Sequence, residues 1–172
     1  MEDETVKAII TFLNIVGYIS SILVLAGIVV GFILWSRGIL PAMIRLGNGL
    51  SKRKIALFAK SDHFTSLKDL LLDSTLFNEK NIFAITQEDD IGKAEQASIY
   101  LVYWDDWGSA YQKILNKKTD SCALIIYARP ASIPHDIMEE IELHRNTIVN
   151  NFRGRLLNDV VSTMITTAYK RK

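Results

Sequence analysis

Hydrophobic residues follow two different patterns along the chain. The first is a long uninterrupted run, Ala8 to Trp35, which holds no charged residue. A helix needs roughly 20 apolar residues to cross the hydrocarbon core of a bilayer, so the run predicts one transmembrane helix within residues 1–36. The second pattern begins near Lys54, where short apolar runs alternate with stretches of helical spacing, which is typical of a separate α/β domain.

The short apolar runs predict a parallel sheet. They are continuous rather than alternating and rich in β-branched and aromatic residues, as strands buried on both faces are. The predicted strands cover residues 54–59, 81–85, 98–103, 122–127 and 146–150, and the predicted helices cover 64–77, 89–96, 109–116, 134–144 and 155–169. This alternation predicts a flavodoxin-like, three-layer α/β domain over residues 54–172, with five parallel strands in the order 2-1-3-4-5.

Residues 37–53 join the two patterns and predict an amphipathic connector. Their apolar side chains cluster on one side of a helix; Pro41 suits the first turn of that helix, and Gly47 to Gly49 suit its end. Such a helix can lie on the membrane surface, and a packed linker is the alternative. In either case the connector joins the membrane segment to the domain.

The residues that flank the apolar run predict its orientation. Glu2, Asp3 and Glu4 precede it, whereas basic residues follow it in the connector. By the positive-inside rule we expect a single-pass protein of the inner (plasma) membrane, with its N-terminus outside and its C-terminal domain in the cytoplasm. The acidic start and the length of the run also argue against a cleaved signal peptide.

Small residues within the run predict association between copies of the chain. Gly27 and Gly31 form a GxxxG pattern. Small residues four positions apart let two membrane helices approach closely. We therefore expect this face to support a homo-oligomer.

Composition narrows the function. The 172 residues carry a formal net charge of +1, which argues against binding to duplex nucleic acid. The single cysteine, Cys122, lies within an apolar run, so we expect a buried, reduced core residue. The three histidines lack the spacing of a metal site, and neither a metal nor a cofactor is predicted.

The loops after the predicted strands hold the candidate site, because ligands of doubly wound folds bind beyond the carboxyl ends of the strands. These loops carry arginines and a tryptophan, which suit a phosphate and a stacked base. The predicted ligand-binding residues are Ser61, His63, Asp105, Trp107, Ser109, Arg129, Arg153, Gly154 and Arg155. Arg153 and Arg155 flank a glycine at the start of the last predicted helix, where free backbone N–H groups favour an anion.

Catalytic motifs find little support. Asp105 or Asp106 resembles the phosphorylated aspartate of response-regulator receivers, but the other acidic, hydroxyl and lysine residues of that family are missing. The domain also resembles, loosely, a TIR-type NAD hydrolase, for which only the acidic run Glu139 to Glu142 offers a glutamate near the cleft. The sequence holds no GxSxG or GxxxxGK motif, and no catalytic residue is predicted.

The overall layout resembles small membrane-anchored effectors of prokaryotic antiviral defence. The resemblance lies in the architecture of the whole chain: an apolar run, a connector that contains Pro41, and a compact α/β domain that contains the string Asn151 to Arg155. It implies a cytoplasmic domain that senses a nucleotide second messenger, such as a cyclic oligoadenylate, and then perturbs the membrane segment.

Three functions are therefore carried forward as hypotheses. The first is a membrane-anchored effector that senses a phosphate-containing ligand. The second is a non-catalytic TIR-like or pseudo-receiver module that recruits a partner protein at the membrane. The third is an enzyme that cleaves NAD or another nucleotide. The sequence favours the first hypothesis, because basic residues lie at the predicted strand ends and no catalytic residue is predicted.

Overall fold

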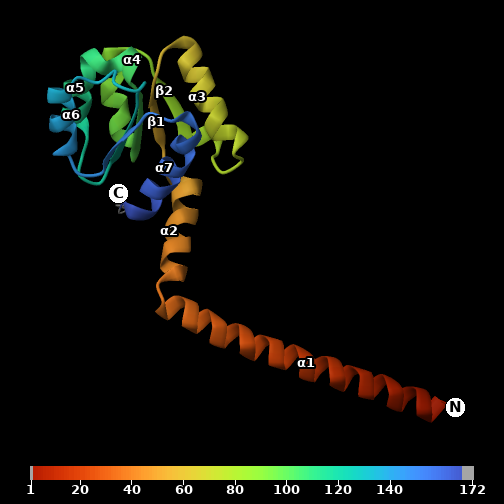
Figure 1. Cartoon of the computed structure of the whole chain (residues 1–172). Coiled ribbons are helices and arrows are strands. Elements are labelled where there is room, and N and C mark those ends of the chain that lie inside the picture. The colour runs from red at the N-terminus through yellow and green to blue at the C-terminus, as the bar shows by residue number, and fades with distance from the viewer. Residues whose placement is uncertain (1, 168–172) are drawn as a thin grey trace. The chain divides into compact units, whose positions relative to one another are not determined.

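A computed structural model describes residues 2–167, and the chain divides after Met43 into two compact units. The first unit holds helix α1 (Glu2–Ser36) and the first residues of helix α2 (Ile39–Lys52). The second unit holds the remainder of α2 and the α/β domain (Figure 1). The division falls inside the predicted connector rather than at either of its ends.

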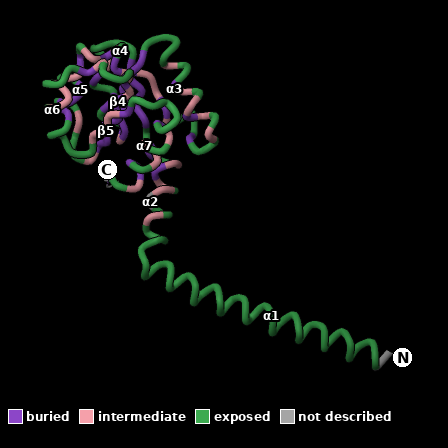
Figure 2. Tube along the Cα trace, viewed as in Figure 1, coloured by how far each residue is buried: buried purple, intermediate pink, exposed green. Residues whose placement is uncertain are grey.

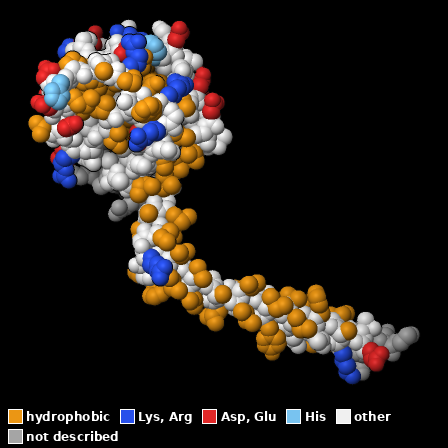
Figure 3. All heavy atoms as spheres, viewed as in Figure 1, with side chains coloured by type: hydrophobic (Ala, Val, Ile, Leu, Met, Phe, Trp, Pro, Cys, Tyr) orange, Lys and Arg blue, Asp and Glu red, His pale blue; other side chains and the backbone are white. Residues whose placement is uncertain are grey.

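Helix α1 is apolar along most of its length. Its segment Glu4–Ser36 is long and apolar enough to cross a membrane, and every side chain in that segment is exposed (Figure 2). Hydrophobic side chains cover the helix, and charged side chains gather at its N-terminal end (Figure 3). The hydroxyls of Thr11, Ser20 and Ser21 donate to backbone carbonyls one turn earlier. Their hydrogen-bonding needs are met within the helix, which suits an apolar surrounding.

Helix α2 confirms a helical connector, but the predicted helix end at Gly47 to Gly49 is wrong. The helix continues through these residues to Lys52. The reason is tertiary packing, because a Cβ atom at Gly49 would lie 3.0 Å from the Cβ of Met164 in helix α7 (Arg153–Thr166). A glycine at position 49 permits this close approach.

The sheet has the predicted topology. Strands β1 (Ile55–Phe58), β2 (Ile82–Ile85), β3 (Ile99–Tyr103), β4 (Ala123–Tyr127) and β5 (Thr147–Asn150) are all parallel and lie in the order β2-β1-β3-β4-β5. The α/β fold class and the strand order are therefore confirmed. Each predicted strand matches an observed one to within one residue at either end, because a strand buried on both faces has a distinctive continuous apolar pattern.

The helices differ more from the prediction. The observed segments are α3 (Ser61–Asp73), η1 (Glu79–Asn81), η2 (Glu88–Gln96), α4 (Trp104–Trp107), η3 (Gly108–Ala110), α5 (Tyr111–Lys117), α6 (His135–Glu142) and α7. The stretch predicted as a helix over 89–96 is a 3-10 helix, and the loop expected after β3 is the short helix α4. Helix α7 begins at Arg153, two residues earlier than predicted, and the predicted end at Tyr169 lies outside the described residues.

The core has one apolar cluster on each face of the sheet. The first lies against η2, α4, α5 and α6. The second lies against α3 and α7, and Leu46 and Leu50 of α2 pack on it. Cys122 is a free, buried cysteine of the first cluster, in agreement with the sequence. Burial raises the pKa of its thiol from 9.0 to about 12.

Candidate functional site

The candidate site lies at the carboxyl ends of β1 and β3, where the chain leaves the sheet toward opposite faces. Helix α3, which follows β1, packs on one face, whereas α4 and α5, which follow β3, pack on the other. Divergent connections leave a crevice between two neighbouring strands, and such a switch point is where ligands of open α/β sheets bind.

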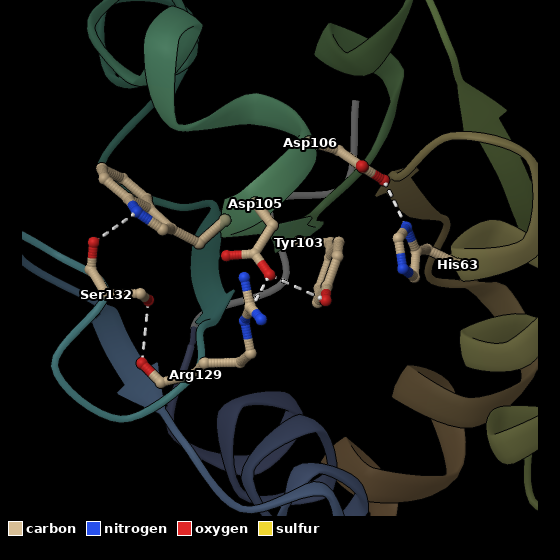
Figure 4. A network of polar contacts seen from close by, with 7 residues as sticks. His63, Tyr103, Asp105, Asp106, Arg129 and Ser132 are labelled. Atoms are coloured by element: carbon tan, nitrogen blue, oxygen red, sulfur yellow. Dashed lines mark hydrogen bonds and ion pairs between the residues drawn. The ribbon is translucent and has the colours of Figure 1, made fainter.

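Asp106 joins the two sides of this switch point. Its Oδ2 accepts a hydrogen bond of 2.8 Å from the backbone N–H of Lys60. The same oxygen lies 3.1 Å from Nδ1 of His63 (Figure 4). The His63 ring also lies 4.3 Å from the ring of Tyr103, centroid to centroid. The Asp106 side chain is only 13% exposed, whereas that of His63 is 52% exposed. The imidazole is therefore held in place yet open to a ligand.

Asp105 makes a second polar contact beside the first. Its Oδ2 lies 2.7 Å from Nε of Arg129 and accepts a hydrogen bond of 3.0 Å from the hydroxyl of Tyr103 (Figure 4). Partial burial, and then the neighbouring Asp105 carboxylate, raise the pKa of the Tyr103 phenol. The phenol therefore stays protonated and continues to donate at neutral pH. Arg129 remains 73% exposed despite its ion pair.

The loop after β4 is fixed by its own hydrogen bonds. The Ser132 hydroxyl donates to the carbonyl of Arg129 at 2.8 Å, and the Trp104 indole N–H donates to the carbonyl of Ser132 at 3.2 Å (Figure 4). Ala131 adopts a positive φ of 59°, which closes this turn. The loop therefore presents the Arg129 side chain from a constrained backbone.

The loop after β5 brings helix α7 to the same edge. The buried Asn150 accepts a hydrogen bond of 2.7 Å from the backbone N–H of Phe152, and its amide donates to Asp159 of α7. Arg153 then reaches across to α3, where its guanidinium donates to the carbonyl of Ser66 at 2.8 Å. Arg153 thus bridges the first turn of α7 and helix α3.

The structure brings only part of the predicted set together. His63, Asp105 and Arg129 lie in the network of Figure 4. Trp107 lies elsewhere: it is 2% exposed and packs edge-on against Phe58, with ring centroids 5.3 Å apart. Its rings are therefore covered and offer no open face for stacking.

The other predicted residues are exposed, and each follows the carboxyl end of a strand. Ser61 begins α3 with a positive φ of 40°, and Ser109 lies in η3. Gly154 and Arg155 lie in the first turn of α7. No hydrogen bond from the side chains of Ser61, Ser109 or Arg155 to the rest of the site is present among residues 2–167.

Sequence reasoning missed several residues that the structure places at the site. Tyr103 and Tyr127 end adjacent strands, and their rings lie 5.7 Å apart. Phe152 is an exposed aromatic residue beside Arg153. Each of these residues ends a strand or lies within two residues of a strand end, so its position in the pattern was the available signal.

The edge carries basic and acidic side chains together. Arg129 forms an ion pair with Asp105, whereas Arg153 and Arg155 have no acid within ion-pair distance in the described part of the chain. Within residues 2–167, no group of three or more His, Cys, Asp or Glu side chains could hold a metal ion. Guanidinium groups bind phosphate through paired N–H donors, so the exposed arginines are the side chains of this edge that could contact an anion.

Comparison with known proteins adds no family to this description. No protein-family model matches the chain, and a search of curated proteins finds no match.

Proposed function

We propose that the chain is a membrane-anchored effector whose α/β domain senses a phosphate-containing ligand, of the nucleotide second messenger class, and alters its membrane segment. The observation that carries this proposal is the set of arginines on the ends of β4 and β5. Arg129 is held by a fixed loop yet exposed, and Arg153 and Arg155 lie two residues apart in the first turn of α7. All three arginines therefore follow the carboxyl ends of two neighbouring strands, β4 and β5.

The membrane part of the proposal rests on α1 and α2. Helix α1 is long and apolar enough to span a bilayer, and α2 exposes Ile39, Leu40, Met43 and Ile44. An exposed apolar face on a helix that directly follows such a segment suits the interface of the same membrane. The positive-inside rule then directs the domain to the cytoplasmic side of an inner (plasma) membrane.

Self-association belongs to the same proposal. A single helix cannot line a pore, so an effector that opens the membrane requires several copies. Gly27 and Gly31 have open space around their Cα atoms, which a second helix can approach closely. The architectural resemblance to antiviral effectors supports a role in prokaryotic antiviral defence.

A thermal-shift screen of the full chain in detergent micelles tests the sensing function. The panel contains phosphate, pyrophosphate, AMP, ATP, NAD, cyclic dinucleotides and cyclic oligoadenylates. A ligand that binds only the folded state stabilises it by about 2.7 kcal/mol at a hundredfold excess over its dissociation constant. We expect at least one phosphate compound to raise the melting temperature. Flat melting curves across the whole panel would contradict the proposal.

A second candidate is a tethered interaction module that recruits a protein. It is favoured by the internal pairing of the site, since Asp105 and Asp106 already satisfy Arg129 and His63 within the chain. The exposed Phe152 beside this network offers an apolar contact to a partner. The two candidates differ in the ligand screen, because only the sensor responds to a small phosphate compound.

A further inference from the structure

Helix α7 links the candidate site to the helix that leads to the membrane segment. Its first residue, Arg153, lies at the carboxyl edge of the sheet, and its last residues contact the C-terminal part of α2. With 14 residues at 1.5 Å each, the helix is about 21 Å long. Both ends are tied to other elements by side-chain contacts, so the helix has a defined joint at either end.

The joint at the carboxyl edge is the contact between Arg153 and the Ser66 carbonyl of α3. This is a bond from a charged donor to a neutral acceptor. A guanidinium binds an anionic oxygen more strongly than a carbonyl, through shorter and often paired hydrogen bonds. A phosphate group at this edge can therefore take Arg153 away from Ser66.

The joint at the other end is tighter. Arg53, the residue after α2, is 2% exposed, and its guanidinium donates to the hydroxyl and carbonyl of Thr167 at 2.5 and 2.6 Å. One turn earlier, the Gly49 backbone approaches Met164 closely enough that an added Cβ would lie 3.0 Å from that side chain. Two contacts therefore fix the C-terminal end of α7 to the end of α2.

Between these joints α7 is seated on the sheet. Leu156, Val160 and Met164 are fully buried in the same apolar cluster as α3 and the strands. Densely packed interfaces shift between discrete arrangements rather than deform continuously. A change at one end of α7 is thus transmitted along the helix instead of being absorbed within it.

We infer that α7 couples the carboxyl edge of the sheet to α2, with the Arg153–Ser66 contact as the latch that a bound anion opens. The claim that a bound anion opens this contact rests on the proposed function. The claim that α7 couples the edge of the sheet to α2 does not. A ligand shifts such an equilibrium only by its differential affinity for the two states. In this case the difference is whether Arg153 is bound to Ser66 or is available to the anion.

Hydrogen–deuterium exchange on the full chain in detergent micelles tests the coupling without any ligand. Arg153→Gln weakens the latch, and Arg145→Gln is its matched control, since it makes the same change of charge at an exposed arginine outside the candidate site. We expect Arg153→Gln to raise exchange at least twofold at residues 46–53 of the α2 region, with amides of β3 unchanged. Exchange in Arg145→Gln should match the wild type at both places.

Other exchange patterns overturn the coupling. One is an effect of Arg153→Gln confined to α3 and the first turn of α7. Another is an increase spread equally over β3, which would report general destabilisation rather than transmission along α7. A third is an equal response of both variants at residues 46–53.

The same experiment with pyrophosphate separates the two claims. If pyrophosphate raises exchange at residues 46–53 in the wild type but not in Arg153→Gln, it acts through the latch. If pyrophosphate does not bind the wild type while Arg153→Gln still loosens α2, the coupling stands and pyrophosphate is not the trigger. If pyrophosphate binds with no change at residues 46–53, the latch is wrong and the sensing function is unaffected.

Discussion

At the scale of single residues, Asp106 is the group that connects the two strand ends of the candidate site. It accepts from the Lys60 backbone N–H and contacts His63, and its own side chain is largely covered. We expect Asp106→Ala to destabilise the domain by about 0.5–1.5 kcal/mol, because the backbone N–H of Lys60 and the imidazole of His63 lose their common partner. Urea denaturation followed by circular dichroism measures this loss.

The exposed Asp69 of the same region supplies the control for that measurement. Asp69→Ala removes the same charge from the solvent-facing part of α3. We expect it to change the free energy of unfolding by no more than about 0.5 kcal/mol, as exposed sites usually do. Equal losses in the two variants would show that Asp106 has no special structural role.

Cys122 gives a residue-scale prediction about pH. Its pKa is raised from 9.0 to about 12 because burial disfavours the thiolate. The unfolded chain releases this proton more readily than the folded chain, so the contribution of the thiol is constant below pH 9 and falls as pH rises from 9 toward 12. We expect Cys122→Ser to flatten that part of the stability curve, measured by urea denaturation at several pH values.

The reactivity of the same thiol is a second readout. A buried thiol of raised pKa reacts slowly with Ellman's reagent at pH 8, because the thiolate is the reactive form. We expect reaction only when urea unfolds the domain. Rapid reaction of the folded chain would show that Cys122 is accessible.

Single residues also show what the sequence could and could not reveal. His63, Asp105 and Arg129 were predictable, since a parallel sheet collects the ends of its strands at one edge. The hydrogen-bond acceptor of the Lys60 backbone N–H was not predictable, because this acceptor, Asp106, lies 46 residues away in the chain. Trp107 was predicted to stack on a ligand because it lies in the loop expected after a strand, yet the helical turn of α4 directs it into the core.

At the scale of elements, α2 shows how one residue type serves two purposes. Glycine often marks a helix end, and on that basis the sequence predicted an end at Gly47 to Gly49. The structure instead uses Gly49 as the contact point with Met164, whereas a Cβ atom added at Gly47 would meet nothing within 4 Å beyond the backbone of its own helix. Local sequence does not distinguish these uses, since the difference lies in a helix far along the chain.

Two alanine substitutions separate these roles. Gly47→Ala gains helix propensity in open space, and we expect it to stabilise the domain by about 0.5–1 kcal/mol. Gly49→Ala gains the same propensity but overpacks against Met164, at a typical cost of about 1–3 kcal/mol. Thermal denaturation should therefore place Gly49→Ala below Gly47→Ala. The reverse order would mean that α2 and α7 are not closely packed.

The remaining elements follow the same division between local and distant causes. The bounds of the strands were predicted closely because a strand that is buried on both faces consists of a continuous run of apolar residues. The start of α3 was missed because Ser61 has a positive φ and the Lys60 N–H bonds to Asp106 across the switch point. The periodic pattern of a helix contains neither the backbone conformation of its first residue nor a contact with a distant residue.

At the scale of the whole molecule, the proposed function requires α1 to hold the chain in a membrane, and α1 is long and apolar enough to span one. Val24 lies in the middle of the apolar helix. We expect Val24→Arg to reduce membrane insertion, because an arginine at the helix centre costs about 2.5–3.5 kcal/mol. Extraction of cell membranes with alkaline carbonate measures the integrated fraction.

The matched control adds the same charge to the domain. Thr65 is exposed on α3, and Thr65→Arg should leave the chain in the membrane fraction. If Val24→Arg remains as resistant to extraction as the wild type, α1 does not hold the chain in the bilayer.

The central claim is that the carboxyl edge of the sheet binds a phosphate-containing ligand through its arginines. The most direct test is isothermal titration of the full chain in micelles with the compound that gives the largest thermal shift. Three proteins are compared: the wild type, the double variant Arg129→Ala/Arg153→Ala, and the control Arg145→Ala. Arg145 is exposed and precedes the N-terminal end of β5, at the opposite edge of the sheet from the candidate site. We expect the dissociation constant of the double variant to be at least tenfold larger than that of the wild type, a loss of about 1.4 kcal/mol of binding free energy. We expect Arg145→Ala to bind with the dissociation constant of the wild type. An unchanged dissociation constant in the double variant would contradict the central claim.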